Sequence, residues 1–201
     1  MKTAQNQLER LADLLHEAGM LRRIPRSGYA FLGTGGENVA EHSYRVAVAG
    51  YALARLSGAD AARVVLMCLF HDLHEARTGD FNYVNRLYNE CRARKALEDA
   101  LEGTGLSGEL LKLFDEFEVP ESLEAELARD ADQLDLICDL AVELSKGNTF
   151  ASEWIENALK RLRSPVAREL AEKILRSDPN RWWYAHVDKD WWSRREEHGR
   201  S

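Results

Sequence analysis

The chain has 201 residues, of which 45% are hydrophobic and 30% are charged, a balance typical of a globular protein with a sizeable core in one domain. Its formal net charge of −7 argues against a nucleic-acid partner, because no global basic field is available to attract phosphate backbones. An odd number of widely spaced cysteines (Cys68, Cys91 and Cys138), no signal peptide and no apolar run long enough to cross a bilayer indicate a reducing, cytoplasmic setting without a membrane partner.

The first predicted element is an amphipathic helix over residues 8–18, which ends at Gly19 and which we expect to cover the core. A loop over residues 21–29 follows, and it carries three arginines. These are Arg22, Arg23 and Arg26. In an acidic chain they are the best local candidates for binding an anion, although a solvated basic loop fits the pattern equally well. The glycine-rich residues 33–36 have neither a P-loop lysine nor a preceding strand, so we do not predict a phosphate-cradling loop there.

A capped helix is predicted from Asn38 to about Leu56. Asn38 is a good N-cap residue, and Glu41 three positions later completes the pattern of a capping box. His42 lies in the first turn of this helix. A single histidine there is more often a surface residue or a hydrogen-bonding group than a metal ligand, so only a second polar site nearby makes His42 a ligand candidate.

The most informative stretch is an apolar run over residues 59–70 that ends in a polar cluster. The run contains neither Pro nor Gly, which favours one buried helix. His71, Asp72, His74 and Glu75 follow, at spacings that bring them together on the last turn. Burying such groups is costly unless they are paired, and a divalent metal is the simplest partner for imidazole nitrogens and carboxylate oxygens. The alternative is a helix end that carries solvated polar groups.

The helical pattern ends after this cluster. Gly79 permits a tight turn, and Asp80 lies just beyond the polar helix end, where it could also be an ordinary turn aspartate. Amphipathic helices are then predicted over residues 89–102 and 106–118, and Pro120 ends the second.

The longest predicted helix covers residues 121–146, with leucines and isoleucine at core spacing. Its interrupting aspartates are Asp130, Asp132, Asp135 and Asp139. We expect the first and last to face solvent, and one of the middle two to point inward. Ser152 and Ser164, the latter followed by proline, are predicted to start two more helices. No alternating β pattern occurs, so the predicted fold is all-α.

Four of the five tryptophans lie in a carboxy-terminal extension that begins at about residue 178. Aromatic residues at a chain end usually clamp the tail onto the domain or fill a subunit interface. A platform for stacking bases is less compatible with the acidic charge. Residues 1–201 are predicted to form a single domain, of which this extension is the carboxy-terminal part.

Four segments, in their order and approximate spacing, resemble the HD-domain metal-dependent phosphohydrolases, and in particular their 5′-deoxynucleotidase branch. They are Arg22-Arg23-Ile24-Pro25-Arg26-Ser27-Gly28, Glu37-Asn38-Val39-Ala40-Glu41-His42-Ser43, His71-Asp72-Leu73-His74-Glu75 and Thr78-Gly79-Asp80. The likeness extends from about Leu8 to Leu144. It implies an all-α HD-domain helical bundle with one divalent metal per site. The ligands that the resemblance implies are His42, His71, Asp72 and Asp132, with Asp135 as the alternative to Asp132.

The same resemblance implies roles for three further residues. Glu75 matches the residue that activates or relays a proton from the attacking water. Asp80 matches a residue near the nucleotide sugar and the phosphate-side water, and Arg23 falls where the family keeps a phosphate-binding arginine. The bacterial enzyme has a tryptophan after that arginine, whereas this chain has Ile24 and resembles the human-type group more closely at this position.

The function that follows is a metal-dependent phosphatase that hydrolyses deoxyribonucleoside 5′-monophosphates to deoxyribonucleoside and phosphate. It is expected to be a cytoplasmic homodimer whose partner is a small-molecule nucleotide. The sequence leaves the metal open among Mn, Co, Fe, Ni, Mg and Zn.

Three alternatives stay open from the sequence. The protein could be an HD phosphohydrolase with another substrate, such as a nucleoside triphosphate or a different phosphomonoester. It could bind a metal and a nucleotide without catalysis, as a sensor or scaffold. It could also be a helical interaction module that works through the tryptophan-rich tail.

Overall fold

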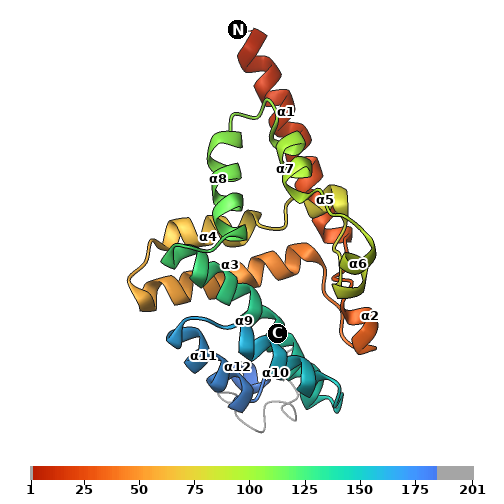
Figure 1. The fold of residues 1–201 in the computed structure, drawn as a ribbon, viewed down its shortest axis with the longest axis vertical. Helices are drawn as coiled ribbons and strands as arrows, with labels where there is room; N and C mark the ends of the chain where they lie inside the picture. Colours follow the sequence, from red (N-terminus) through yellow and green to blue (C-terminus); the bar gives the residue numbers. More distant parts are fainter. Residues whose placement is uncertain (1, 185–201) are drawn as a thin grey trace, which may run out of the picture.

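The structure is a computed structural model that describes residues 2–184, and every regular element in that range is a helix, as the sequence predicts (Figure 1). The helices are α1 (Lys2–Ala18), the 3₁₀ helix η1 (Gly19–Arg23), α2 (Tyr29–Leu32), α3 (Val39–Ser57), α4 (Ala61–Phe70), α5 (Glu75–Thr78), α6 (Tyr83–Tyr88), α7 (Ala93–Leu101), α8 (Ser107–Glu118), α9 (Leu123–Ser145), α10 (Ala151–Arg161), α11 (Pro165–Arg176) and α12 (Arg181–Tyr184). None of the helices in the described range is both long enough and apolar enough to span a membrane.

Helix α9 is the central element of the bundle. It packs against α3, α4, α10 and α11, and α3 also packs along α4 (Figure 1). Leu127, Leu134 and Ile137 recur at helical spacing and are at most 1% exposed, so one face of α9 lies in the main core. The aspartates of α9 therefore lie on a helix that is in contact with several others.

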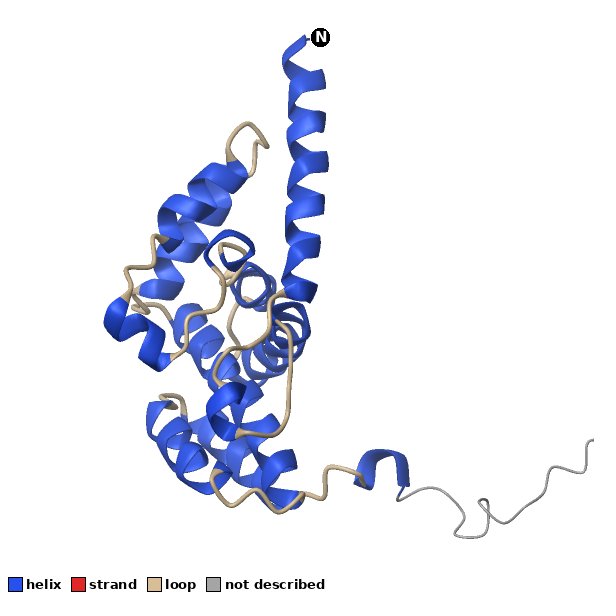
Figure 2. Cartoon of the chain, turned by 90° about the vertical axis from the view of Figure 1, so that its right-hand side faces the viewer, coloured by secondary structure: helices blue, strands red, loops and turns tan. Residues whose placement is uncertain are grey.

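Helix α1 extends away from the body of the protein, most clearly in Figure 2. Leu14 is buried near its carboxy-terminal end, whereas Leu8 and Leu15 are 69% and 75% exposed. The expectation that this helix covers the core is therefore correct only for its last turns.

The predicted polar helix end is in fact a turn between two helices. Helix α4 ends at Phe70, and His71 is its C-cap residue. The N–H group of Glu75 then donates to the carbonyl of Asp72 at 2.9 Å, three residues back, which tightens the chain before α5 begins. The prediction that the whole cluster shares the last turn of one helix is wrong, because this tighter turn redirects the backbone after His71.

Local capping signals set several helix ends. Asn38 and Glu41 form the predicted capping box of α3, and the Ser164 hydroxyl caps α11 with proline in its first turn. Helix α10 begins at Ala151, one residue before the predicted Ser152 cap. Helix α6 was not predicted, and the helix expected over residues 89–102 is the shorter α7.

The expected carboxy-terminal extension is described only as far as Tyr184. Trp182 and Trp183 lie in α12 and are 80% and 39% exposed. Trp191 and Trp192 lie outside the described residues. The role expected for this tail therefore stays a prediction, as does the single-domain organisation.

Candidate metal centre

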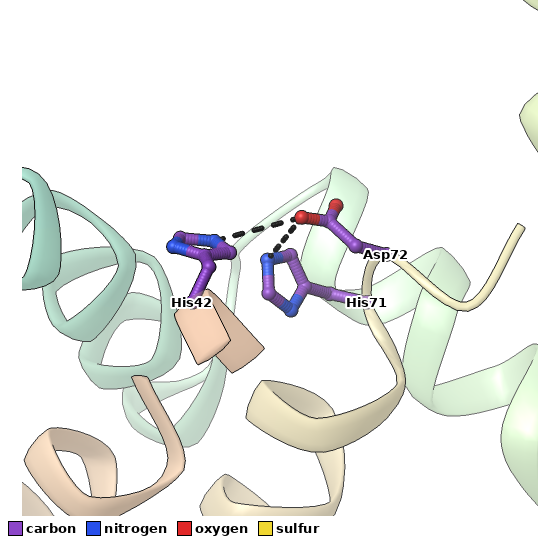
Figure 3. A group of neighbouring side chains, drawn as sticks. All are labelled: His42, His71 and Asp72. Atoms are coloured by element: carbon purple, nitrogen blue, oxygen red, sulfur yellow. Dashed lines mark ion pairs between the residues drawn. The ribbon is translucent and has the colours of Figure 1, made fainter. Parts of the chain in front are cut away.

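Residues from three separate parts of the chain meet at the amino-terminal end of α3. His42 belongs to the first turn of α3, His71 and Asp72 follow α4, and Asp132 lies in α9. Asp72 Oδ2 is 3.5 Å from His42 Nε2 and 3.1 Å from His71 Nε2, as the dashed lines of Figure 3 mark. Asp132 Oδ1 is 3.3 Å from the same His42 Nε2. The four residues that the sequence predicts as metal ligands are thus brought together.

Both histidines present the same nitrogen to this cluster. His42 and His71 are buried, at 0% and 5% exposure, and each uses its Nδ1 for a hydrogen bond elsewhere. His71 Nδ1 bonds the carbonyl of Cys68 at 2.9 Å. Their Nε2 atoms, in contrast, are buried without a hydrogen-bond partner among the described residues. A buried polar atom without a partner is costly, so the pair of Nε2 atoms is suited to a ligand that both can share.

The carboxylates of the cluster are held in their charged form. Burial would raise the pKa of Asp72, but His71, His42 and Arg26 hold it well below its usual range. The pKa of Asp132 is lowered in the same way, against burial, by His42 and His71. Two imidazoles and two carboxylates are a donor set that suits several divalent metals, and the side chains present therefore fit such an ion.

Asp132 and Asp135 have different positions, although the sequence leaves them as alternatives. Asp132 faces Nε2 of His42, on the side of the cluster, and its side chain is 23% exposed. Asp135 is nearly fully buried and contacts the opposite ring nitrogen, with Oδ2 2.6 Å from His42 Nδ1. Asp132 is therefore the better placed ligand candidate, and Asp135 lies behind the histidine.

Glu75 is buried beside the cluster, at 3% exposure, and its Oε2 has no hydrogen-bond partner among the described residues. One ligand atom each of Glu75, Asp72 and His74 lie within 4.8 Å of one another. Burial, together with the charges of Asp72 and Asp80, raises the pKa of Glu75 to about 9. A carboxyl group in such surroundings can gain and lose a proton in the range where enzymes work.

Asp80 fastens the arginine loop to the cluster. Its Oδ2 accepts hydrogen bonds from the N–H group and the hydroxyl of Ser27, at 2.5 and 2.9 Å. Its Oδ1 lies 3.3 Å from Arg26 Nη1, which also approaches Asp72 Oδ2 at 3.5 Å. Arg26 is thus the loop arginine that contacts the cluster, one of the three that the sequence offers as anion-binding candidates.

Arg23, the arginine that the resemblance favours, occupies a different position. It is exposed in η1 and lines an open hollow of about 290 Å³ together with Arg22, Glu37 and Glu41. Arg26, rather than Arg23, contacts the carboxylates of the cluster. A phosphate-binding role for Arg23 stays a prediction.

Comparisons with known proteins identify the family of this chain. The sequence model of the HD domain family matches residues 18–174. The human protein named 5′-deoxynucleotidase HDDC2 is 29% identical over 133 residues, which cover 63% of this chain and 65% of the human protein. A 5′-deoxynucleotidase of Vibrio vulnificus is 34% identical over 126 residues, which cover 56% of this chain and 65% of that protein. The match therefore spans just under two thirds of the length of these relatives.

Solved structures show the same fold. A conserved hypothetical protein from Pyrococcus furiosus is 31% identical in sequence and superposes with a TM-score of 0.69. The superposition covers 83% of this chain and 99% of that protein. The likeness therefore includes nearly all of the archaeal chain.

Proposed function

The chain belongs to the HD domain family, and from that premise we propose that it is a metal-dependent phosphatase acting on deoxyribonucleoside 5′-monophosphates. The products would be the deoxyribonucleoside and phosphate. The observation that carries the proposal is the pair of buried Nε2 atoms, on His42 and His71, which have no hydrogen-bond partner in residues 2–184 and lie beside the carboxylates of Asp72 and Asp132. The names of the human and Vibrio relatives support the choice of substrate.

In this proposal a divalent ion, Mn, Co, Fe, Ni, Mg or Zn, is held by His42, His71, Asp72 and Asp132. Such an ion lowers the pKa of a bound water and neutralises phosphoryl oxygens, which is the chemistry that phosphomonoester hydrolysis requires. The protein supplies the neutral imidazole nitrogens and the ionised carboxylates. It also keeps most of the cluster away from bulk solvent, where competing water would weaken each contact.

Glu75 is the residue that we assign to proton transfer. Its free Oε2 and its raised pKa suit a group that takes a proton from the attacking water or gives one to the leaving oxygen. Asp80 holds the loop that carries Arg26, so its proposed catalytic and substrate-binding roles include placing that arginine. Arg26, and the exposed Arg23, would offer guanidinium groups to the phosphate.

We further propose that the enzyme is a cytoplasmic homodimer. Three apolar side chains spaced along the outer face of α3 support a second copy as partner: Tyr44, Val48 and Tyr51, at 71%, 54% and 53% exposure. Cys68, Cys91 and Cys138 are free thiols, which is compatible with a reducing compartment.

The test is phosphate release by metal-stripped protein that is reloaded with one metal at a time. We expect Mn(II) or Co(II) to restore release of inorganic phosphate from deoxyribonucleoside 5′-monophosphates, with less from the matching ribonucleotides. Release of triphosphate from nucleoside triphosphates would favour the alternative substrate class. Tight nucleotide binding without any product, with each metal supplied, would indicate a sensor and contradict the proposal.

A further inference from the structure

We propose that Asp135 is a positioning residue, which holds the ring of His42 so that Nε2, and not Nδ1, faces the metal cluster. This inference rests on the proposed function, because it concerns the same site. It assigns a role to a residue that the sequence offers only as an alternative ligand, and it makes Arg45 part of the same arrangement.

The contact between Asp135 and His42 determines which ring nitrogen keeps its proton when the ring is neutral. Asp135 Oδ2 lies 2.6 Å from His42 Nδ1, and the two residues are 2% and 0% exposed. An ionised carboxylate can only accept hydrogen bonds, so Nδ1 must donate. The lone pair that remains for a metal is then the one on Nε2, which points toward Asp72 and Asp132.

Asp135 is itself fixed in place by Arg45. Arg45 Nε donates to the other oxygen, Oδ1, and its Nη2 lies 3.4 Å from the Asp135 carbonyl. Nη2 also contacts Glu37 Oε1 at 3.0 Å and Asp139 Oδ1 at 2.6 Å. Because one carboxylate oxygen of Asp135 binds the arginine and the other binds the histidine, rotation of the carboxylate would break both contacts.

The second histidine of the cluster, His71, is oriented by a hydrogen bond to the backbone. His71 Nδ1 bonds the backbone carbonyl of Cys68, an acceptor that no side-chain substitution removes. Of the two Nδ1 hydrogen bonds, only that of His42 therefore depends on a replaceable side chain. Asparagine at position 135 could turn its NH₂ group toward Nδ1, which would then accept a hydrogen bond. The proton of the neutral ring would move to Nε2, where it would block metal binding.

Asp135→Asn tests this role, and Asp139→Asn is the matched control. Asp139 lies one helical turn further along α9 and also binds Arg45, but among the described residues its carboxylate contacts Arg45 and Tyr29 rather than His42. The first readout is Co(II) affinity, measured by competition with a chelator. The second is the NMR signal of the His42 Nδ1–H proton in Zn(II)-loaded protein, with the His71 Nδ1–H signal as an internal reference.

We expect Asp135→Asn to weaken Co(II) binding by about 10–100-fold. The same change should move the His42 proton signal upfield, because a neutral amide is a weaker acceptor than a carboxylate. Asp139→Asn should leave Co(II) affinity close to that of the wild type, and the His71 signal should stay unchanged in both variants. Asp135→Glu, which keeps a carboxylate acceptor, should recover part of the lost affinity.

Wild-type Co(II) affinity together with an unchanged His42 signal in Asp135→Asn would overturn the proposal. If that variant does not fold, Arg45→Lys serves instead, because its side chain is 38% exposed and lysine cannot form the same fork. Undiminished affinity and an unshifted His42 signal in Arg45→Lys would again refute the role. Neither readout requires phosphate release, so wild-type protein that binds Co(II) without hydrolysing nucleotides contradicts the proposed function alone.

Discussion

His42 Nε2 lies 3.3 Å from Asp132 Oδ1, so the first turn of α3 meets the middle of α9 at the cluster. Neither element could form this contact alone, because the two residues belong to distant segments that the helical core brings together. The contact brings a second carboxylate to the cluster, in addition to that of Asp72, which lies beside His71. Metal binding should therefore depend on residues of both segments.

Removing a carboxylate from the cluster should remove the metal. We expect Asp72→Ala to lose nearly all bound metal after purification, because its Oδ2 lies within 3.5 Å of both histidine Nε2 atoms. Elemental analysis of dialysed protein measures this directly. Asp115→Ala, an exposed change in α8 at the ion pair with Arg94, is the control and should keep the wild-type metal content. Equal metal content in both variants would remove Asp72 from the ligand set.

Glu75 should affect turnover more than metal binding. Glu75→Gln keeps the size of the side chain but cannot exchange a proton, so we expect kcat to fall by about 10²–10⁴-fold while the metal is retained. Steady-state phosphate release and metal analysis on the same sample check both halves. Wild-type kcat in this variant would exclude Glu75 from the proton-transfer step.

The two candidate arginines can be compared directly. Arg26 reaches Asp72 and Asp80, whereas Arg23 is exposed in η1, so Arg26→Ala should raise KM more than Arg23→Ala does. Loss of a charged hydrogen bond to phosphate corresponds to roughly 1.5–3 kcal/mol, or about a tenfold to hundredfold change. A larger effect from Arg23→Ala would return the phosphate site to the position that the family resemblance favours.

Metal affinity should increase with pH. Burial lowers the pKa of His42, but the neighbouring carboxylates of Asp132 and Asp135 outweigh it and raise the pKa to about 10 in the metal-free protein. Metal binding needs the neutral ring, so a proton must leave whenever the pH is below that value. For one displaced proton, Co(II) affinity should rise by up to about tenfold per pH unit between pH 6 and 8. Affinity that does not vary over this range would contradict the pKa assignment.

Close packing between α3 and α4 gives a prediction about stability. A Cβ atom added at Gly50 would lie 2.6 Å from Cys68 Sγ and 3.0 Å from Val64 Cγ1. We expect Gly50→Ala to lower the free energy of unfolding by about 1–3 kcal/mol, because the two helices must move apart. Gly108→Ala, where an added Cβ meets nothing within 4 Å, should cause no such loss in the same denaturant titration.

The sequence predicts features that depend on residues close together in the chain better than those that depend on contacts between distant segments. The caps of α3 and α11 follow from side chains within three residues, and both are confirmed. Asp130, in contrast, is predicted to face solvent, and that prediction is wrong because its side chain is buried. It accepts hydrogen bonds from the N–H groups of Arg163 and Ser164, which the sequence alone does not place beside it.

The candidate site shows the same division. The spacing of His71, Asp72 and Glu75 suggested a metal cluster before the fold was considered, and the family resemblance added His42 and Asp132. The contact of Asp135 with His42 joins residues 93 positions apart, so helical spacing could not distinguish the positioning role that we propose for Asp135 from the ligand role that we propose for Asp132. Only the packing of α3 on α9 separates the two aspartates.

Anomalous scattering at the cobalt edge, from crystals grown with Co(II), would locate the bound ion directly. We expect a single strong peak within coordination distance of His42 Nε2, His71 Nε2 and carboxylate oxygens of Asp72 and Asp132. Absence of a peak at this cluster, with His42 and Asp132 far apart, would contradict this expectation.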